Sequence, residues 1–149
     1  MSAYTLRAPE TADFEALYRI HRAAMGAHVE ATWGPWDEAA QRILFDARIE
    51  RGLLKVSEVD GAVAGLLELD DRFAPFDVEN IALDPAYQGR GVGTAVLQSV
   101  QAQATELGID VHLQVLRVNP AQRFYRRLGF VERGGTETHW LMRWSPAVL

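Results

Sequence analysis

The sequence predicts a mixed α/β fold whose sheet combines antiparallel and parallel strands. Strand-like segments outnumber helical ones, and the two kinds alternate only in the second half of the chain. An all-parallel sheet needs a crossover helix between successive strands, so that arrangement is disfavoured. At 149 residues, 48% of them hydrophobic, the chain is long enough to bury a core, and we expect a single domain over residues 1–149.

Short segments rich in β-branched and apolar residues, bounded by Gly, Pro and Asp, predict the strands. Asp60-Gly61 joins two of them as a hairpin, and Asp84-Pro85 ends the next one. The predicted strands cover residues 4–8, 53–59, 62–70, 76–83, 109–116, 130–133 and 139–144.

Apolar residues at helical spacing predict the helices. Phe14, Leu17 and Tyr18 begin the first one, with Thr11 as its N-cap, and Pro120 lies in the first turn of the last one. The predicted helices cover residues 11–25, 37–52, 94–107 and 120–128, and residues 26–36 are expected to form an irregular connection.

Composition excludes several classes of function. A net charge of −5 argues against general nucleic-acid binding. The chain has no cysteine, which excludes disulfides, thiolate metal sites and a cysteine nucleophile, and its four histidines show no metal-ligand spacing, so no metal is expected. No run approaches the roughly 18 apolar residues of a membrane span, and a cytoplasmic location without a membrane partner is the expectation.

Residues 87–96, "YQGRGVGTAV", place Gly89, Gly91 and Gly93 between a predicted strand and a predicted helix. Glycine permits positive φ and a close approach of the backbone, and phosphates bind N–H groups at such helix N-termini. The loop lacks the lysine of a Walker A motif and does not complete G-x-G-x-x-G, so a nucleotide-binding module is disfavoured. By itself the loop is equally compatible with a tight turn.

Two motifs together resemble the GNAT superfamily of N-acetyltransferases over about residues 76–131. Residues 88–93 match its pyrophosphate loop, written Q/R-x-x-G-x-G/A, and "LQVLRVNPAQRFYRRLGF" is similar to its second motif. The resemblance implies a mostly antiparallel central sheet of about six to seven strands, about four helices, and splayed fourth and fifth strands. It also implies acetyl-CoA as the acetyl donor.

The resemblance implies a cofactor site built from a strand, the glycine loop and the second motif. Main chain of the strand would pair with the pantetheine arm, the N–H of Leu83 would face the thioester oxygen, and the loop would bind the pyrophosphate. Asn119 and Tyr125 are six residues apart, one fewer than the commoner family spacing. The expected cofactor-binding residues are Ile81, Ala82, Leu83, Gln88, Gly89, Arg90, Gly91, Val92, Gly93, Thr94, Asn119 and Tyr125.

Transfer to an amine requires removal of a proton from the amine and donation of one to the leaving thiolate. Glu79 is the expected base and Asp77 the second candidate, with an acidic strand end as the structural alternative. Tyr125 matches the family tyrosine that donates to the thiolate, and a core aromatic is its alternative.

The acceptor is expected to be a primary amine of a small molecule or peptide. Glu30 and Trp33 are candidate substrate-binding residues, because they fall where the family forms its acceptor pocket. Without cysteine, an acyl-cysteine route is closed and direct attack on the thioester is expected. The alternative function is a catalytically silent acyl-CoA-binding regulatory domain, and a homodimer is left open.

Overall fold

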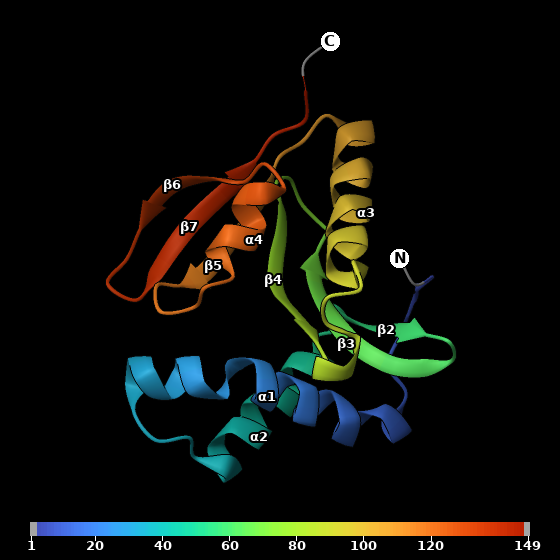
Figure 1. Ribbon diagram of the computed structural model, residues 1–149, viewed down its shortest axis with the longest axis vertical. Coiled ribbons are helices and arrows are strands. Elements are labelled where there is room, and N and C mark those ends of the chain that lie inside the picture. Colours follow the sequence, from blue (N-terminus) through green and yellow to red (C-terminus); the bar gives the residue numbers. More distant parts are fainter. Residues whose placement is uncertain (1–2, 148–149) are drawn as a thin grey trace. The chain divides into compact units, whose positions relative to one another are not determined.

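The computed structural model describes residues 3–147, and Figure 1 shows the order of its elements. The helices are α1 (Phe14–Trp33), α2 (Glu38–Glu50), α3 (Val92–Leu107) and α4 (Gln122–Arg127), with short 3₁₀ turns η1 (Thr11–Asp13) and η2 (Pro85–Tyr87). The strands are β1 (Thr5–Arg7), β2 (Leu54–Val59), β3 (Ala62–Asp70), β4 (Phe76–Leu83), β5 (Val111–Leu116), β6 (Val131–Gly135) and β7 (His139–Trp144).

The strands form one seven-stranded sheet in the order β1-β2-β3-β4-β5-β7-β6. The β1/β2, β2/β3, β5/β7 and β6/β7 pairs are antiparallel, whereas β4 and β5 are parallel. The β4/β5 ladder runs from Phe76 opposite Val111 to Val78 opposite Leu113, although the two strands continue to Leu83 and Leu116. The predicted mixed, mostly antiparallel sheet is confirmed, and the short parallel ladder is what splayed strands require.

The chain divides into two compact units, which are described separately below. Among the described residues, the first unit contains residues 3–69 and 80–93, and the second contains residues 70–79 and 94–147. The expectation of a single domain stays a prediction.

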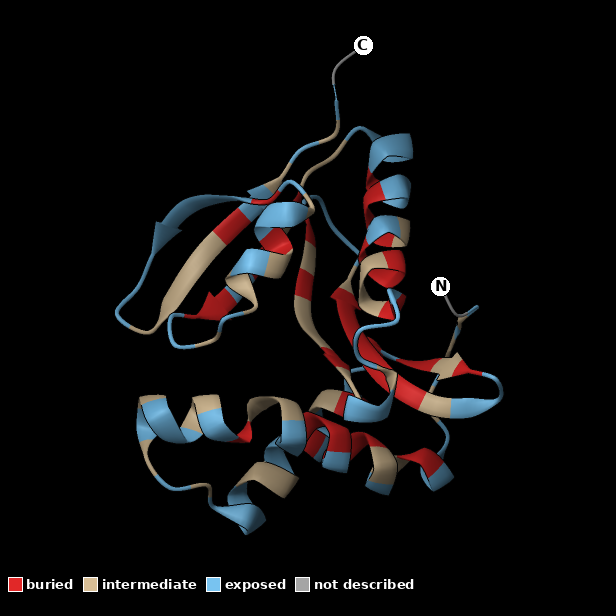
Figure 2. Cartoon of the chain, viewed as in Figure 1, coloured by how far each residue is buried: buried red, intermediate tan, exposed pale blue. Residues whose placement is uncertain are grey.

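The core of the first unit lies between helices α1 and α2 and strands β2, β3 and β4. Leu17 and Ile20 of α1 and Phe45 of α2 pack with Val56 and Leu66 of the strands, and all five are almost fully buried. Figure 2 shows β3 as a nearly continuous buried stretch. Burial of these side chains is the main source of stability, at roughly 1.5–3 kcal/mol for each.

A polar residue interrupts this apolar strand. Glu68 on β3 is fully buried, and its Oε1 accepts hydrogen bonds at 2.8 Å and 2.6 Å from Nε and Nη2 of Arg48 on α2. Arg51 lies 3.7 Å from the other carboxylate oxygen. A buried carboxylate is costly unless it is paired, so this ion pair fixes the position of α2 on the sheet.

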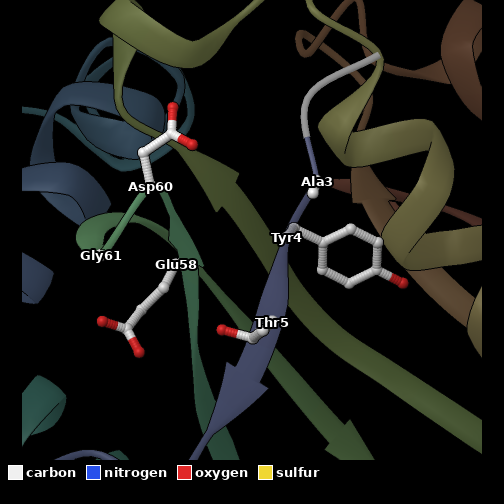
Figure 3. A pocket seen from close by; sticks show the side chains of 6 residues that line it. All are labelled: Ala3, Tyr4, Thr5, Glu58, Asp60 and Gly61. Carbon is white, nitrogen blue, oxygen red and sulfur yellow. The ribbon is translucent and has the colours of Figure 1, made fainter.

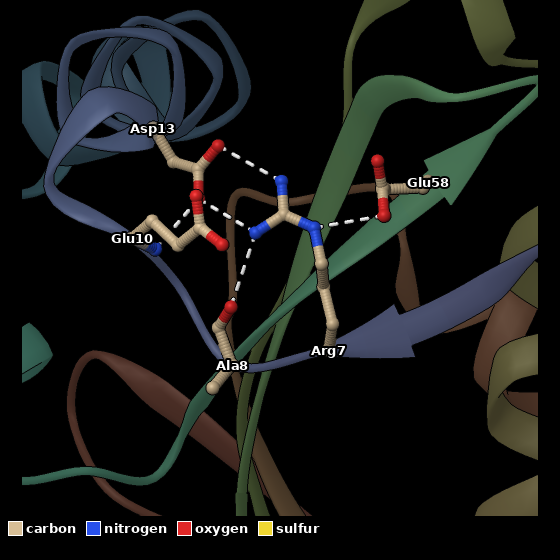
Figure 4. A network of polar contacts seen from close by, with 5 residues as sticks. All are labelled: Arg7, Ala8, Glu10, Asp13 and Glu58. Atoms are coloured by element: carbon tan, nitrogen blue, oxygen red, sulfur yellow. Dashed lines mark hydrogen bonds and ion pairs between the residues drawn. The ribbon is translucent and has the colours of Figure 1, made fainter.

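Arg7 fastens the short edge strand β1 to its neighbours (Figure 4). Its Nη1 and Nη2 donate to the two carboxylate oxygens of Asp13 at 2.7 and 2.9 Å, and its Nε donates to Glu58 of β2 at 2.8 Å. The hydrogen bonds from Arg7 hold the pKa of Asp13 below its ordinary value. One guanidinium therefore joins the end of β1 to both η1 and β2.

The core of the second unit lies between α3, α4 and strands β5 and β7. The almost fully buried side chains of this core are Leu97 of α3, Leu113 of β5, Met142 of β7 and Phe130, which precedes β6. The exposed side of α3 carries polar residues, and Figure 2 shows its buried residues as a stripe along one side of the helix. This stripe is the amphipathic pattern that the sequence predicts for residues 94–107.

The expected irregular connection over residues 26–36 is wrong, because α1 continues to Trp33. Gly26 lies inside the helix, and a Cβ there would meet only Cγ of Arg22, at 4.0 Å. The helix ends instead at Gly34, whose φ is +99° and whose N–H donates to the carbonyl of Glu30. The other boundaries shift by a few residues, since residues 11–13 form a 3₁₀ turn, α3 begins at Val92 and α4 begins at Gln122.

Candidate functional site

In the first unit, the end of β4 leads into the glycine loop. Ile81, Ala82 and Leu83 end the strand, and η2 follows, where the side chain of Asp84 accepts from the N–H of Ala86 at 2.9 Å. The side-chain amide of Gln88 then donates back to the carbonyl of Leu83 at 3.1 Å. This hydrogen bond ties the start of the loop to the strand that the family resemblance assigns to the pantetheine arm.

Two glycines of the loop have the positive φ that glycine permits. Gly89 and Gly91 have φ of +77° and +78°, a region that residues with a side chain rarely adopt. The guanidinium of Arg90 lies 5.2 Å from the ring centroid of Tyr87 and is exposed. Val92 and Gly93 begin α3, and Thr94 follows in its first turn. N–H groups at such a helix start have no partner within the helix and are available to an anion.

Strand β4 lies against β3 at a position where only glycine fits. A Cβ on Gly65 would lie 2.2 Å from the carbonyl oxygen of Ala82 and 2.8 Å from a methyl of Leu83. The N–H of Asp84 donates to the carbonyl of Ala64 at 2.7 Å in the same region. Gly65 therefore sets the position of residues 82–84.

A buried histidine contacts the same strand. Nδ1 of His21, on α1, lies 3.1 Å from the side-chain nitrogen of Asn80, and its ring stacks on Phe45 at 4.9 Å between centroids. Burial, with a smaller contribution from the charge of Arg48, lowers the pKa of His21 to about 4. His21 is therefore neutral at pH 7, and it packs in the core of the first unit.

The two candidate acceptor residues lie on the last turns of α1. The carboxylate of Glu30 accepts a weak hydrogen bond from the N–H of Trp36 at 3.4 Å, whereas Trp33 is 60% exposed. Trp36 itself donates from its indole to the hydroxyl of Tyr18 at 3.2 Å, and Tyr18 donates to Glu38 at 2.5 Å. The connection between α1 and α2 is thus held by polar contacts.

In the second unit, the first half of β4 carries both candidate bases. Asp77 and Glu79 are half-buried and alternate with the buried Phe76 and Val78. Asp77 is opposite His112 of β5, and Glu79 follows the last pair of the parallel ladder. The two carboxylates therefore project from the same side of the strand, as the sequence predicts.

Tyr125 is buried on α4 and has neighbours typical of a core residue. Its ring centroid lies 5.4 Å from that of Phe124 and 6.0 Å from that of Phe130. Burial raises its pKa to about 12, so the hydroxyl carries its proton at neutral pH. No hydrogen bond joins this hydroxyl to another of residues 3–147, which leaves its proton available.

Asn119 has a local structural role before α4. Its side-chain carbonyl accepts from the N–H of Ala121 at 2.9 Å, and its own N–H donates to the carbonyl of Leu116. This turn takes the chain from β5 into α4 and accommodates the shortened spacing to Tyr125.

A pocket of the first unit is lined by none of the predicted site residues. It has a volume of about 180 Å³ and is lined by Ala3, Tyr4, Thr5, Glu58, Asp60 and Gly61 (Figure 3). Glu58 is already bound by Arg7, and Asp60 and Gly61 are the positive-φ residues of the β2–β3 hairpin. These three lining residues therefore have structural roles in the β1/β2 pair and the β2–β3 hairpin.

Sequence reasoning missed two arrangements near these residues. Asn80 received no role, although it contacts His21, and Arg117 received none, although its guanidinium lies over Trp140. Both contacts join residues far apart in the sequence, so no local pattern predicts them.

The fold and the strand–loop–helix arrangement are those of an acetyltransferase. A family model described as "Acetyltransferase (GNAT) domain" matches residues 50–132, which is more than half of the chain. The chain belongs to the GNAT family of acetyltransferases. No curated protein matches it in sequence.

Solved structures share the fold over nearly the whole chain. The PaiA N-acetyltransferase from Thermoplasma acidophilum, solved with coenzyme A, has a TM-score of 0.75 and 19% identity over 96% of this chain and 99% of its own. The ribosomal-protein-S18-alanine N-acetyltransferase from Escherichia coli has a TM-score of 0.69 and 24% identity, over 99% and 96%. Ard1 from Thermoplasma volcanium has a TM-score of 0.70 and 22% identity, over 98% and 99%. At these identities, the likeness shows the fold.

Within residues 3–147 no helix has the length and apolar character needed to cross a membrane. The cytoplasmic location and the homodimer stay predictions.

Proposed function

We propose that the chain transfers the acetyl group of acetyl-CoA to a primary amine of a small molecule or peptide, by direct attack of the amine on the thioester. The observation that carries this proposal is the pair of positive-φ glycines, Gly89 and Gly91, immediately before the first turn of α3. Positive φ in a loop before a helix N-terminus allows successive main-chain N–H groups to bind one anion, which supports a pyrophosphate site here.

In this proposal each element of the site supports one part of the reaction. Ile81, Ala82 and Leu83 hold the pantetheine arm through their main chain, and the N–H of Leu83 stabilises the negative charge that develops on the thioester oxygen. Loop residues 88–93 and Thr94 bind the pyrophosphate, with the exposed guanidinium of Arg90 adding positive charge. Asn119 contributes to the pantetheine site.

Side chains of the second unit carry out the two proton transfers. An alkylamine is mostly protonated at pH 7, and Glu79, with Asp77 second, accepts its proton. The hydroxyl of Tyr125 keeps its proton at neutral pH and has no partner among the described residues, which supports a role in donating a hydrogen bond, and then the proton, to the leaving thiolate. Glu30 and Trp33 contribute to acceptor binding. The chain has no cysteine, which closes an acyl-cysteine route.

A thiol-release assay tests this function. Purified protein is mixed with acetyl-CoA and a panel of amines, and free coenzyme A is measured with a thiol reagent while the N-acetyl product is identified by mass spectrometry. Amine-dependent thiol release with an N-acetylated product is expected. Tight binding of acetyl-CoA without turnover on any amine would instead favour a regulatory acyl-CoA-binding domain.

A further inference from the structure

Arg117 follows β5, and its guanidinium lies over an aromatic ring of β7. Its Cζ lies 3.7 Å from the ring centroid of Trp140 on β7, and its Nε donates to the carbonyl of Thr136 at 2.8 Å. Its own N–H donates to the carbonyl of Thr138, so main chain and side chain are both fixed to the β6–β7 hairpin. Stacking and one hydrogen bond together set the plane of the guanidinium.

Gly135 makes room for this arrangement. It is paired with Trp140 in the β6/β7 ladder, and a Cβ on it would lie 2.9 Å from Nη2 of Arg117 and 3.1 Å from Cε3 of Trp140. Its φ is outside the positive region, unlike that of the neighbouring Gly134, so backbone conformation does not require glycine at this position. A larger residue would displace the end of the Arg117 side chain and press on the carbonyl oxygen of His139, which lies 3.1 Å from that Cβ.

The charge of this rigid guanidinium is not neutralised within the described chain. Arg117 is exposed and forms no ion pair with a carboxylate among residues 3–147. The guanidinium has five N–H donors, and the Nε–H is the one that binds another described residue. The four N–H donors on the two terminal nitrogens are therefore available to a ligand. A planar guanidinium of this kind binds a carboxylate through two parallel hydrogen bonds. The Arg117 side chain is already ordered in the free protein, so binding costs little further conformational entropy.

We propose that Arg117, which lies over Trp140 and two residues before Asn119 of the proposed pantetheine site, binds the carboxylate of the acceptor, and that the acceptors are amino acids. This inference rests on the proposed acetyl transfer. A single guanidinium matches the single negative charge of a carboxylate, whereas a phosphate dianion is commonly bound by several cations or by a helix N-terminus. Trp140 and Gly135 serve to orient Arg117.

The test compares α-amino acids with their amides, which keep size and amine but lose the negative charge. KM and kcat are measured for each pair with wild-type protein, Arg117→Gln, Arg117→Lys and the control Arg133→Gln, which removes an exposed charge from the same hairpin. We expect Arg117→Gln to raise KM for the amino acids about 10- to 100-fold and to leave the amides unchanged. Arg117→Lys should raise KM for the amino acids less than Arg117→Gln does, and Arg133→Gln should have the KM values of the wild type.

Binding without turnover separates this inference from the proposed function. The free protein is titrated calorimetrically with N-acetyl-leucine and with N-acetyl-leucinamide. Preferential binding of N-acetyl-leucine that is lost in Arg117→Gln supports the carboxylate site even if no amine is acetylated. Equal loss of amino acids and amides, or a rise in KM for acetyl-CoA alone, would overturn it, and the latter would mean that Arg117 binds a cofactor phosphate.

Discussion

The side-chain nitrogen of Asn80 on β4 lies 3.1 Å from Nδ1 of His21 on α1. Because the amide nitrogen is a donor, Nδ1 must accept, and the imidazole therefore carries its proton on Nε2. Protonation of Nδ1 would remove this hydrogen bond and place a charge near Arg48, in a buried position. The contact therefore links the protonation of His21 to the packing of α1 on β4.

This linkage predicts a pH-dependent stability. The pKa of His21 is about 4 in the folded protein and 6.5 for a free side chain, so between these values the unfolded chain binds a proton that the folded chain does not. The free energy of unfolding should fall as the pH drops from 6.5 to 4, by up to roughly 3 kcal/mol. Urea unfolding at several pH values measures this. His21→Gln should show a smaller decrease than wild type over that interval, and equal decreases would contradict the prediction.

A second prediction concerns the glycine loop. Gly91→Ala should abolish the rise in melting temperature that acetyl-CoA produces, because a methyl group would enter the space of the phosphate and disturb a φ of +78°. Gly52→Ala is the matched control, since Gly52 has a φ of +79° after α2 and open space around it. Both variants should lose about 1–2 kcal/mol of stability. A normal shift in Gly91→Ala would argue against the loop as a phosphate site.

A third prediction identifies the base. Glu79→Gln should lower kcat by roughly 10² or more with little change in acetyl-CoA binding, because the amide cannot accept the amine proton. Asp77→Asn should have a smaller effect. Initial rates at saturating acetyl-CoA measure both, and the reverse order would assign the role to Asp77.

A fourth prediction separates catalysis from packing at Tyr125. Tyr125→Phe keeps the ring between Phe124 and Phe130 and removes a hydroxyl that has no partner among the described residues. Turnover should fall about 10- to 10³-fold while stability is nearly unchanged. Activity and unfolding are measured on one preparation, and full activity per folded molecule would leave Tyr125 as a core residue only.

A fifth prediction contrasts two buried glycines. Gly65→Ala should cost about 1–3 kcal/mol or more, because its Cβ would be 2.2 Å from the carbonyl oxygen of Ala82 and one of the two strands must move. Gly26→Ala should stabilise the protein by roughly 0.5–1 kcal/mol, because Gly26 lies inside a helix with open space around it. Denaturant midpoints measure both. A neutral Gly65→Ala would show that β4 is not fixed at this point.

Local patterns in the sequence predict most of this fold. Residues 139–144 and the Asp60-Gly61 hairpin are found as expected, because alternation and turn chemistry act over a few residues. The last turns of α1 were missed because Gly26 resembles a helix end when its packing is unknown. Glu68 on β3 and the stacking of Arg117 on Trp140 depend on partners distant in the sequence, so they appear only in the folded chain.

The brevity of β1 has a consequence for solubility. Its three residues pair with Val56, Ser57 and Glu58, so Leu54 and Lys55 of β2 lie beyond the end of the β1 ladder. Unpaired strand edges invite other chains to add a strand, and charged side chains, lysine above all, discourage this. Lys55 is exposed there and is the single lysine of the whole sequence. Its charge opposes edge-to-edge aggregation at the part of β2 that β1 does not cover.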